Sequence, residues 1–331
     1  MSSSEESTQG STPEQVPSPT GIVVGIDGSE QSNCALIWAA REAETRKVPL
    51  HLVTAYTVPI FAASGLDGGY ATVDDDVIRQ GAEAVLRESA AKVSHLNVQM
   101  DARVENGDAA GVLLELSETA ELLVFGSRGR GGFIGRLLGS VSTALPAHAK
   151  CPTVTIPLKC AARLNEGTAE AAKVEKVIVV GVDGSDQARY AVLVAAEQAE
   201  RSGSSLHIIC AVQPYTGTLA WMPAPVDREA LFAEIQIQLD AGEKWLRSHF
   251  PKLPIKVELL EGSAVDALVT ASETAELVVM GTRGRGGFAG MMLGSTTDGV
   301  RHHAKGPIMV VRDREDPRQG DRSAFGPLLQ A

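Results

Sequence analysis

The chain has 331 residues, of which 44% are hydrophobic but only 4% aromatic, and its formal net charge is −11. This length predicts two domains of ordinary size, with cores built mainly from Ala, Val, Leu and Ile. The acidic balance argues against nonspecific binding to nucleic acid or to anionic membrane surfaces, because a general excess of Lys and Arg is missing.

The first 20 residues, "MSSSEESTQGSTPEQVPSPT", are polar and contain neither Lys nor Arg nor an apolar core segment. They do not have the pattern of a secretory signal, and we expect a disordered tail over residues 1–20. No apolar run approaches the roughly 18 residues that cross a bilayer, so we expect a soluble, cytoplasmic protein without membrane insertion.

The four cysteines show neither a C-x-x-C pair nor zinc-ligand spacing, which favours ordinary buried or surface thiols and no metal site. They are Cys34, Cys151, Cys160 and Cys210.

Two long segments of the chain recur. "GIVVGIDGSE" at 21–30 matches "VIVVGVDGSD" at 177–186, and "SETAELLVFGSRGRGGFIGRLLGS" at 117–140 matches "SETAELVVMGTRGRGGFAGMMLGS" at 272–295. A repeat of about 155 residues is as long as a whole domain, unlike the short unit of a solenoid. The sequence therefore predicts the duplication of one domain.

Strands and helices alternate in the same order in each copy. Short β-branched runs at 22–26 and 177–182 suit strands buried on both faces of a parallel sheet. After the "DGS" turn, apolar residues of the segment 30–47 recur at helical spacing. In the first copy we predict further strands at 50–56, 98–107, 121–126 and 151–157, and helices at 74–93, 108–119 and 140–149. In the second copy the corresponding strands are 206–212, 254–262, 276–281 and 306–312, and the helices are 228–249, 263–274 and 295–304.

A β-α-β-α order predicts a parallel, doubly wound sheet with right-handed crossovers in each copy. The fold class is therefore α/β, with two tandem domains. The expected domains are residues 21–157 and 176–312, joined by a small, polar linker over 158–175 and followed by a flexible tail over 313–331.

A glycine-rich loop follows the fourth strand of each copy: "GSRGRGGFIGRLLGS" at 126–140 and "GTRGRGGFAGMMLGS" at 281–295. In open α/β sheets ligands bind at the carboxyl ends of the strands, and a helix N-terminus offers unpaired N–H groups that suit phosphate. Glycines let successive N–H groups form a concave anion site. The side chains expected to assist are Arg128, Arg130, Arg283 and Arg285 as charged donors, and Ser140 and Ser295 as hydroxyl donors that also cap the helices.

The spacing of the glycines separates this loop from the commoner phosphate motifs. G-x-x-x-x-G-K-[ST] is absent, and G-x-G-x-x-G fails because Ile134 and Ala289 stand where its third glycine belongs. A glycine-rich turn without a ligand is the alternative for one copy alone. Both copies, however, read G-x-x-G, nine residues, then G-S. Together with "VVGIDGS" and "VVGVDGS", this pattern closely resembles the universal stress protein family, in its nucleotide-binding branch and in the tandem form common among actinobacteria.

The resemblance covers nearly everything except the tails and the linker, and it implies a fold and a ligand. The fold is a five-stranded parallel sheet in each domain, of the adenine nucleotide alpha hydrolase-like type. The ligand is ATP, with Mg²⁺ as an optional companion, bound at the carboxyl edge of the sheet. The implied phosphate and ribose contacts of the first site are Gly126, Ser127, Arg128, Gly129, Arg130, Gly131, Gly132, Gly139, Ser140 and Val141. Those of the second site are Gly281, Thr282, Arg283, Gly284, Arg285, Gly286, Gly287, Gly294, Ser295 and Thr296.

The opposite wall of each implied site comes from the first two strands. The resemblance places Gly25 and Asp27, with Gly181 and Asp183, near base and sugar, and Val53 and Ile209 against adenine. The two aspartates have a second interpretation, because Asp often caps a helix at a strand-to-helix turn. A carboxylate near phosphates is repelled unless a hydroxyl or a cation compensates it, so ribose contact, base contact and an outer-sphere Mg²⁺ role are the alternatives to capping.

The resemblance implies a regulatory role in the stress response, in which ATP occupancy changes the conformation or the partners of the protein. A slow ATP hydrolase is a weaker alternative, because we see no catalytic base or dedicated Lys beside either loop. A structural dimerisation protein with degenerate sites is the other, and two intact motifs count against it. Cyclic AMP in place of ATP is a variant of the first interpretation.

The last strand of each copy suggests how the copies assemble. "CPTVTIP" at 151–157 and "GPIMVVR" at 306–312 are β-prone edge segments that invite pairing. The simplest arrangement pairs the two copies within one chain. A homodimer through edge strands and a regulatory protein partner are further options that the sequence leaves open.

Overall fold

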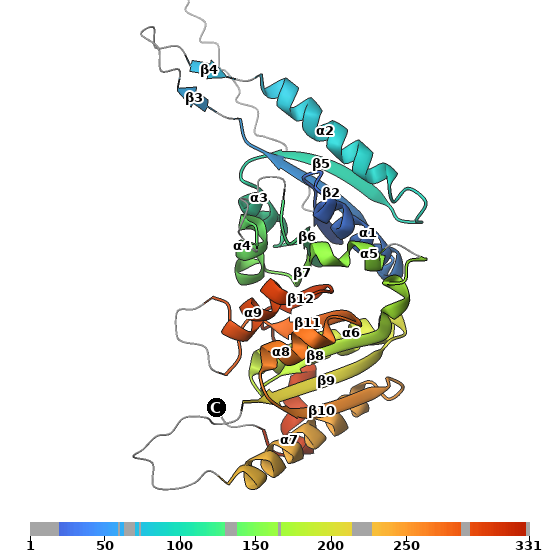
Figure 1. Ribbon diagram of the computed structural model, residues 1–331, viewed down its shortest axis with the longest axis vertical. Coiled ribbons are helices and arrows are strands. Elements are labelled where there is room, and N and C mark those ends of the chain that lie inside the picture. The colour runs from blue at the N-terminus through green and yellow to red at the C-terminus, as the bar shows by residue number, and fades with distance from the viewer. Residues whose placement is uncertain are drawn as a thin grey trace, which may run out of the picture.

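The computed structural model describes residues 20–58, 60–62, 70–72, 74–129, 138–164, 167–213, 227–285 and 292–328. Among these residues, ten strands form one continuous sheet in the order β10-β9-β8-β11-β12-β7-β6-β1-β2-β5 (Figure 1). The five strands of each half are mutually parallel. The α/β fold with a parallel arrangement in each half, predicted from the alternating elements, is thereby confirmed, as are the five strands per half that the resemblance implies.

The elements of the two halves correspond one to one. The first half contains β1 (Ile22–Gly25), α1 (Glu30–Arg46), β2 (Leu50–Tyr56), α2 (Asp75–Ala91), β5 (Met100–Asn106), α3 (Ala109–Leu116), β6 (Leu122–Gly126), α4 (Ser140–His148) and β7 (Thr153–Ile156). The second contains β8 (Glu175–Val182), α6 (Asp186–Ser202), β9 (Ser205–Val212), α7 (Arg228–His249), β10 (Ile255–Glu261), α8 (Ala264–Ala271), β11 (Ala275–Gly281), α9 (Ser295–His303) and β12 (Ile308–Val311). A short antiparallel hairpin, β3 (Ile60–Ala62) with β4 (Tyr70–Thr72), was not predicted from the sequence.

Helices cover both faces of the sheet because successive side chains of its strands point to opposite faces. In β1, Ile22 and Val24 join a core shared with α1, whereas Val23 joins a separate core with α3 and α4. The core on the α1 face is continuous with the core beneath α6 of the second half. Both faces of these strands are therefore buried beneath helices, which explains why the sequences of the strands are unbroken apolar runs.

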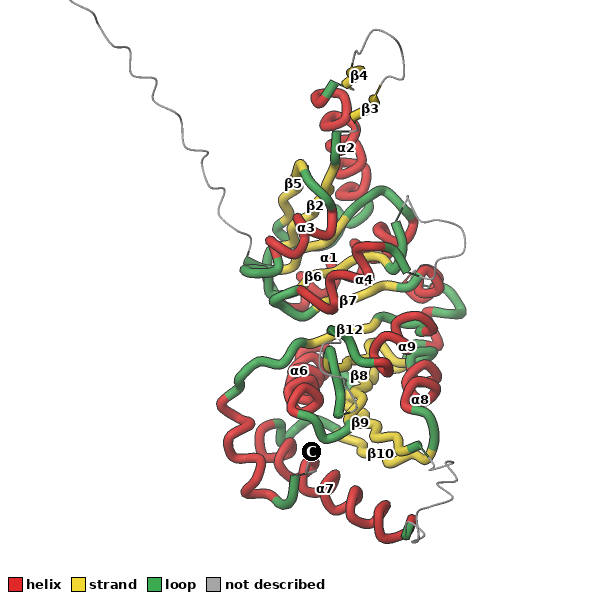
Figure 2. Tube along the Cα trace, turned by 90° about the vertical axis from the view of Figure 1, so that its left-hand side faces the viewer, coloured by secondary structure: helices red, strands yellow, loops and turns green. Residues whose placement is uncertain are grey.

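The two halves meet where β7 pairs antiparallel with β12, and Figure 2 shows these strands at the junction. Ile308 lies opposite Thr155, and Met309 lies opposite Val154. This is the pairing within one chain that the two β-prone segments predict. Because this pairing covers the free edges of both β7 and β12, a homodimer would have to form through other surfaces. None of the helices that the structure describes is long and apolar enough to span a bilayer.

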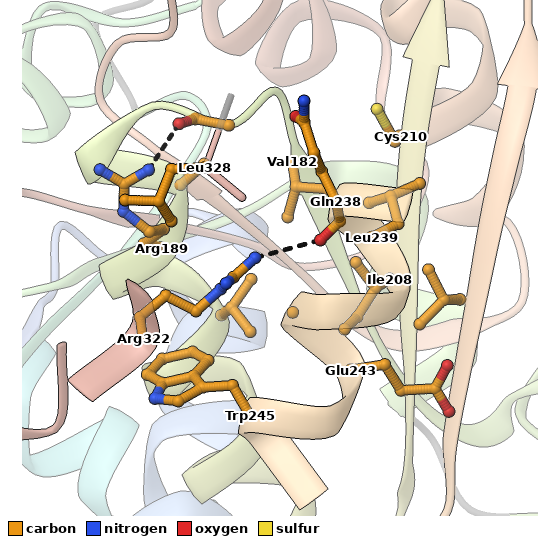
Figure 3. Close-up of a pocket in the computed structure, with 15 residues that line it drawn as sticks. Val182, Arg189, Ile208, Cys210, Gln238, Leu239, Glu243, Trp245, Arg322 and Leu328 are labelled. Atoms are coloured by element: carbon orange, nitrogen blue, oxygen red, sulfur yellow. Dashed lines mark hydrogen bonds between the residues drawn. The ribbon is translucent and has the colours of Figure 1, made fainter. Parts of the chain in front are cut away.

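The linker and the described part of the C-terminal segment contain short helical elements. The linker contains η1 (Leu158–Cys160), α5 (Ala161–Leu164) and η2 (Ala171–Lys173). The C-terminal segment forms η3 (Pro317–Phe325), which packs on α7. Its Arg322 is buried and donates to the carbonyl of Gln238, beside a cavity of about 90 Å³ that Trp245 also lines (Figure 3). Part of the tail that was predicted to be flexible is thus packed on the second half, because its buried arginine donates to a carbonyl of α7.

Candidate functional site

Each half has a cavity at the carboxyl edge of its sheet, of about 420 Å³ in the first half and about 290 Å³ in the second. The cavities lie at the switch point of the strand order: the chain moves from β1 to β2 and β5 on one side, then crosses to β6 on the other. Gly25 and Gly126, at the ends of β1 and β6, both line the first cavity. Gly181 and Gly281 do the same in the second.

Most of the residues predicted to form the two sites line these cavities. In the first half they are Gly25, Asp27, Val53, Gly126, Arg128, Gly129, Gly139, Ser140 and Val141. In the second half they are Gly181, Asp183, Ile209, Gly281, Arg283, Gly284, Gly294, Ser295 and Thr296. Five further predicted residues lie outside the described part of the chain: Arg130, Gly131, Gly132, Gly286 and Gly287.

Three further predicted contacts, Ser127, Thr282 and Arg285, lie within the described part of the chain. Ser127 and Thr282 are buried, and their carbonyls accept from the amides of Gly139 (3.0 Å) and Gly294 (2.8 Å), respectively. These bonds join the two ends of each glycine loop. None of the three is among the residues that line the cavities.

The two aspartates of the first-strand turns do not cap the helices that follow them. The N-cap of α1 is Ser29 and that of α6 is Ser185, and each side chain accepts an amide hydrogen bond of its own helix. Asp27 lies two residues earlier, where its Oδ1 accepts from the Ser29 amide at 3.0 Å. Asp183 Oδ1 accepts in the same way from the amide of Ser185 at 3.0 Å and also from its hydroxyl at 2.7 Å. The capping interpretation is therefore wrong, because the glycine after each aspartate turns the chain (φ 74° and 83°) and delays the helix start.

Each carboxylate lies directly against the glycine loop at the edge of the cavity. A Cβ on Gly129 would lie 2.4 Å from Asp27 Oδ2, and a Cβ on Gly284 would lie 2.1 Å from Asp183 Oδ2. Asp183 Oδ2 also accepts from the amide of Arg285 at 2.7 Å. The second glycine of G-x-x-G is therefore required here by the close approach of an aspartate of the same half.

The helices that begin at the cavities have unusual N-termini. Their N-caps are Gly139 and Gly294, which provide no side-chain cap, while Ser140 and Ser295 are the first helical residues. The prediction that these serines cap the helices is wrong, because their side chains come one residue too late. Every other described α-helix of eight or more residues has a side-chain cap: Ser29, Asp74, Asp108, Ser185, Asp227 or Ser263. The N–H groups left without a side-chain acceptor are thus those at the cavities, where an anion would satisfy them.

A hydroxyl in the first turn of each helix fixes the helix to its loop. Ser142 Oγ donates to the carbonyl of Ser127 at 2.8 Å, and Thr297 Oγ1 donates to the carbonyl of Gly281 at 2.8 Å. Both residues line their cavities but were not predicted from the sequence. The signal was present, since a hydroxyl residue stands two positions after each G-S pair.

The remaining walls are small and apolar. Val53 and Ile209, the residues predicted to contact adenine, line the two cavities, with Ala55 and Ala211 two residues further along the same strands. The third helix of each half was predicted from the sequence, but its contribution to the site was not. It contributes Ala109 and Leu113 to the first cavity and Ala264 and Leu268 to the second. Their periodic pattern marked a helix, but only the sheet topology shows that this helix begins beside the cavity. Among the described residues, no group of three or more His, Cys, Asp or Glu is placed to hold a metal ion.

These features define an α/β protein with two pseudosymmetric cavities, each combining an uncapped helix N-terminus with a glycine loop and an apolar wall. The family model of the universal stress protein family matches residues 20–157 and 175–312. The chain belongs to this family. A universal stress protein of Mycobacterium tuberculosis is 33% identical over 306 residues, covering 89% of this chain and 97% of that relative.

Solved structures agree on the fold. The crystal structure of a universal stress protein from Archaeoglobus fulgidus superposes with a TM-score of 0.61 at 20% identity, covering 89% of this chain and 98% of the other. A universal stress protein solved in complex with cAMP is 27% identical but covers 41% of this chain and 96% of the other, with a TM-score of 0.33.

Proposed function

We propose that the protein binds one ATP molecule in each half and acts as a regulator in the stress response, with a conformation or partner set that depends on nucleotide occupancy. The observation that carries the proposal is the pair of glycine-capped helices that begin at the cavities. Their free N–H groups and positive dipole ends suit a phosphate chain. The first cavity, at about 420 Å³, falls within the range of small-molecule sites, and the second, at about 290 Å³, lies close to its lower end.

In this proposal different residues of each half contact the phosphates, the ribose and the adenine ring of the nucleotide. The amides of Ser140 and Val141, with the Arg128 guanidinium, would hold the phosphates of the first nucleotide. The Asp27 carboxylate would accept a ribose hydroxyl, because the adjacent Ser29 amide compensates its charge. The apolar wall at Val53 would take the adenine ring.

The cavity walls favour binding over chemistry. In their described part each contains one aspartate and one arginine as charged side chains, and neither Lys, His nor Glu. Phosphoryl transfer needs a group that orients the nucleophile together with cationic stabilisation of the transition state. We therefore propose a binding protein, with slow ATP hydrolysis and a purely structural role as the alternatives.

The test starts with the nucleotide that copurifies with the protein. Freshly purified protein is denatured, and the supernatant is separated by ion exchange; up to two equivalents of adenine nucleotide per chain are expected. Calorimetric titrations of nucleotide-free protein with ATP, ADP and cAMP, each with and without Mg²⁺, then give stoichiometry and preference. ATP that is converted to ADP over time would indicate a hydrolase. An empty supernatant with no measurable titration would favour the structural role and contradict the proposal.

A further inference from the structure

Pro146 lies inside α4 and leaves one carbonyl of that helix without its usual donor. In a regular helix the carbonyl of Ser142 accepts from the amide four residues later, and that residue is Pro146, which has no N–H. The repeat aligns Pro146 with Arg301 of α9. At this position, one copy therefore has a residue without a backbone N–H and the other has a cationic side chain.

Arg301 supplies the missing donor from the other half of the molecule. Its Nη2 donates to the carbonyl of Ser142, across the junction formed by β7 and β12. Figures 1 and 2 both place α4 and α9 on the same face of the sheet, with one helix on each side of this junction. The Arg301 side chain is fully buried, and its nearest carboxylate oxygen, on Asp298, is 3.5 Å away.

Burial of this guanidinium is costly, which indicates that it does more than fill space. Desolvation lowers the pKa of Arg301 to about 10, with Asp298 opposing the shift. Within the described residues its Nε has no hydrogen-bond partner. An apolar side chain would avoid this cost, but it would leave the carbonyl of Ser142 buried and unpaired.

Ser142 connects this contact to the first cavity. It is the third residue of α4, about 3 Å along the helix axis from Ser140, and it lines the cavity. Its hydroxyl donates to the carbonyl of Ser127 at the start of the glycine loop. Arg301 therefore holds the turn of α4 whose amides face the cavity.

We propose that Arg301 of the second half is a positioning residue for the nucleotide site of the first half. The first site depends on a side chain of the second half, whereas the second site does not depend on a side chain of the first half. In α9 the carbonyl of Thr297 has a regular donor available, the backbone amide of Arg301, so the second site needs no side chain from the first half. This inference rests on the proposed nucleotide binding.

The test measures each site separately in the full chain. Gly284→Val closes the second site and Gly129→Val closes the first, because a Cβ at either position would collide with an aspartate carboxylate. With only the first site open, Arg301→Met is expected to raise the Kd for ATP about tenfold, the effect of one lost charged hydrogen bond. With only the second site open, it is expected to change the Kd less than about twofold.

Pro146→Ala provides the rescue. The substituted alanine would restore an N–H to pair with the carbonyl of Ser142, so the double variant Pro146→Ala/Arg301→Met is expected to recover the wild-type Kd at the first site. Arg322→Met, which removes another buried arginine of the second half, is the matched control and should leave the first site unchanged.

The outcomes are distinguishable. If the starting proteins bind no nucleotide, the proposed function and this inference both fail. If they bind ATP, but Arg301→Met affects both sites equally or Pro146→Ala does not restore binding in a folded protein, only the inference fails. Circular dichroism and thermal unfolding of each variant establish that it is folded.

Discussion

Gly129 and Gly284 each lie against the carboxylate of an aspartate from the first-strand turn of the same half. The clearance is so small that a Cβ would lie within 2.4 Å of Asp27 Oδ2 or 2.1 Å of Asp183 Oδ2. These carboxylates are held by amide donors of their own turn, so they cannot retreat without losing hydrogen bonds. At this position the loop needs glycine for space, since neither residue has a positive φ that would itself require glycine.

Gly129→Ala is therefore expected to displace Asp27 and to raise the Kd for ATP at the first site at least about tenfold, since both the carboxylate and the loop must move. Calorimetry on protein with the second site left intact would show the loss of one of two binding events. Gly81→Ala is the matched control, because nothing lies within 4 Å of its added Cβ. Unchanged binding in Gly129→Ala would mean that Asp27 takes no part in the site.

The four cysteines are all buried. Burial raises the pKa of Cys151 to about 12 and the pKa values of Cys160 and Cys210 to about 11. Burial likewise raises the pKa of Cys34, with Glu30 adding to the shift. The thiols therefore stay protonated in the folded protein at physiological pH, as inert structural thiols do.

This predicts how stability depends on alkaline pH. The raised groups bind protons more tightly in the folded chain, so their contribution is complete below pH 9 and is lost as the pH rises toward 11 and 12. Each such thiol should lower the free energy of unfolding by about 1.4 kcal/mol per pH unit in that window. Urea unfolding at pH 8, 9 and 10 measures the slope. The variant Cys151→Ala/Cys160→Ala/Cys210→Ala should show a weaker dependence of the free energy of unfolding on pH. An identical dependence would mean that other groups cause it.

At the scale of elements, the C-terminal segment is the clearest difference between the halves. Arg322 of η3 donates to the carbonyls of Gln238 (3.1 Å), Gly326 (3.3 Å) and Pro327 (3.5 Å). Trp245 of α7 donates from Nε1 to Asp321 at 2.7 Å. One helix of the second half is thus clamped by residues that follow the repeat.

Arg322→Met is expected to lower the free energy of unfolding of the second half by about 2–3 kcal/mol, because the buried carbonyl of Gln238 loses its donor. Urea unfolding followed by tryptophan fluorescence is the measurement, since Trp245 touches the same segment. Arg314→Met, at an exposed position of the segment, should leave the midpoint unchanged. Equal midpoints for both variants would show that η3 contributes nothing to stability.

At the scale of the whole molecule, the two halves share a sheet and one core. The core cluster on the α1 and α6 face runs from Ile22 through Val154 to Met309 and Leu206 without interruption. Across the same face Gln198 of α6 donates to the buried carboxylate of Glu42 on α1 at 2.8 Å. Separation of the halves would expose this core and the edges of β7 and β12.

Residues 1–157 expressed alone are therefore expected to self-associate, because the free edge of β7 and its apolar face seek a partner. Light scattering coupled to gel filtration should give at least twice the mass of the fragment. The full chain at equal concentration is the control, since its β7 edge is already paired. A monomeric fragment would show that the pairing with β12 is not needed to cover this edge.

The features that could be predicted from the sequence are those that depend on residues close together along the chain. The β-branched runs predicted β1 and β8, and helical spacing predicted α7 with its observed bounds, because these patterns need only the strand and helix periods. Most of the residues that the family resemblance implied as contacts line the two cavities, since phosphate sites at helix N-termini depend on a short stretch of chain. The helix caps at Gly139 and Gly294 were missed because one residue of turn geometry decides them.

The amino-acid sequence by itself determined the duplication, the order of strands and helices, and the glycine loops at the ends of β6 and β11. Only the tertiary structure decided that Asp27 faces Gly129, that Leu113 closes the cavity wall, and that Arg301 serves a carbonyl left open by Pro146. The physical reason is separation along the chain. Periodicity and turn chemistry act over a few residues, whereas these contacts join segments that meet only when the sheet has formed and the two halves have paired.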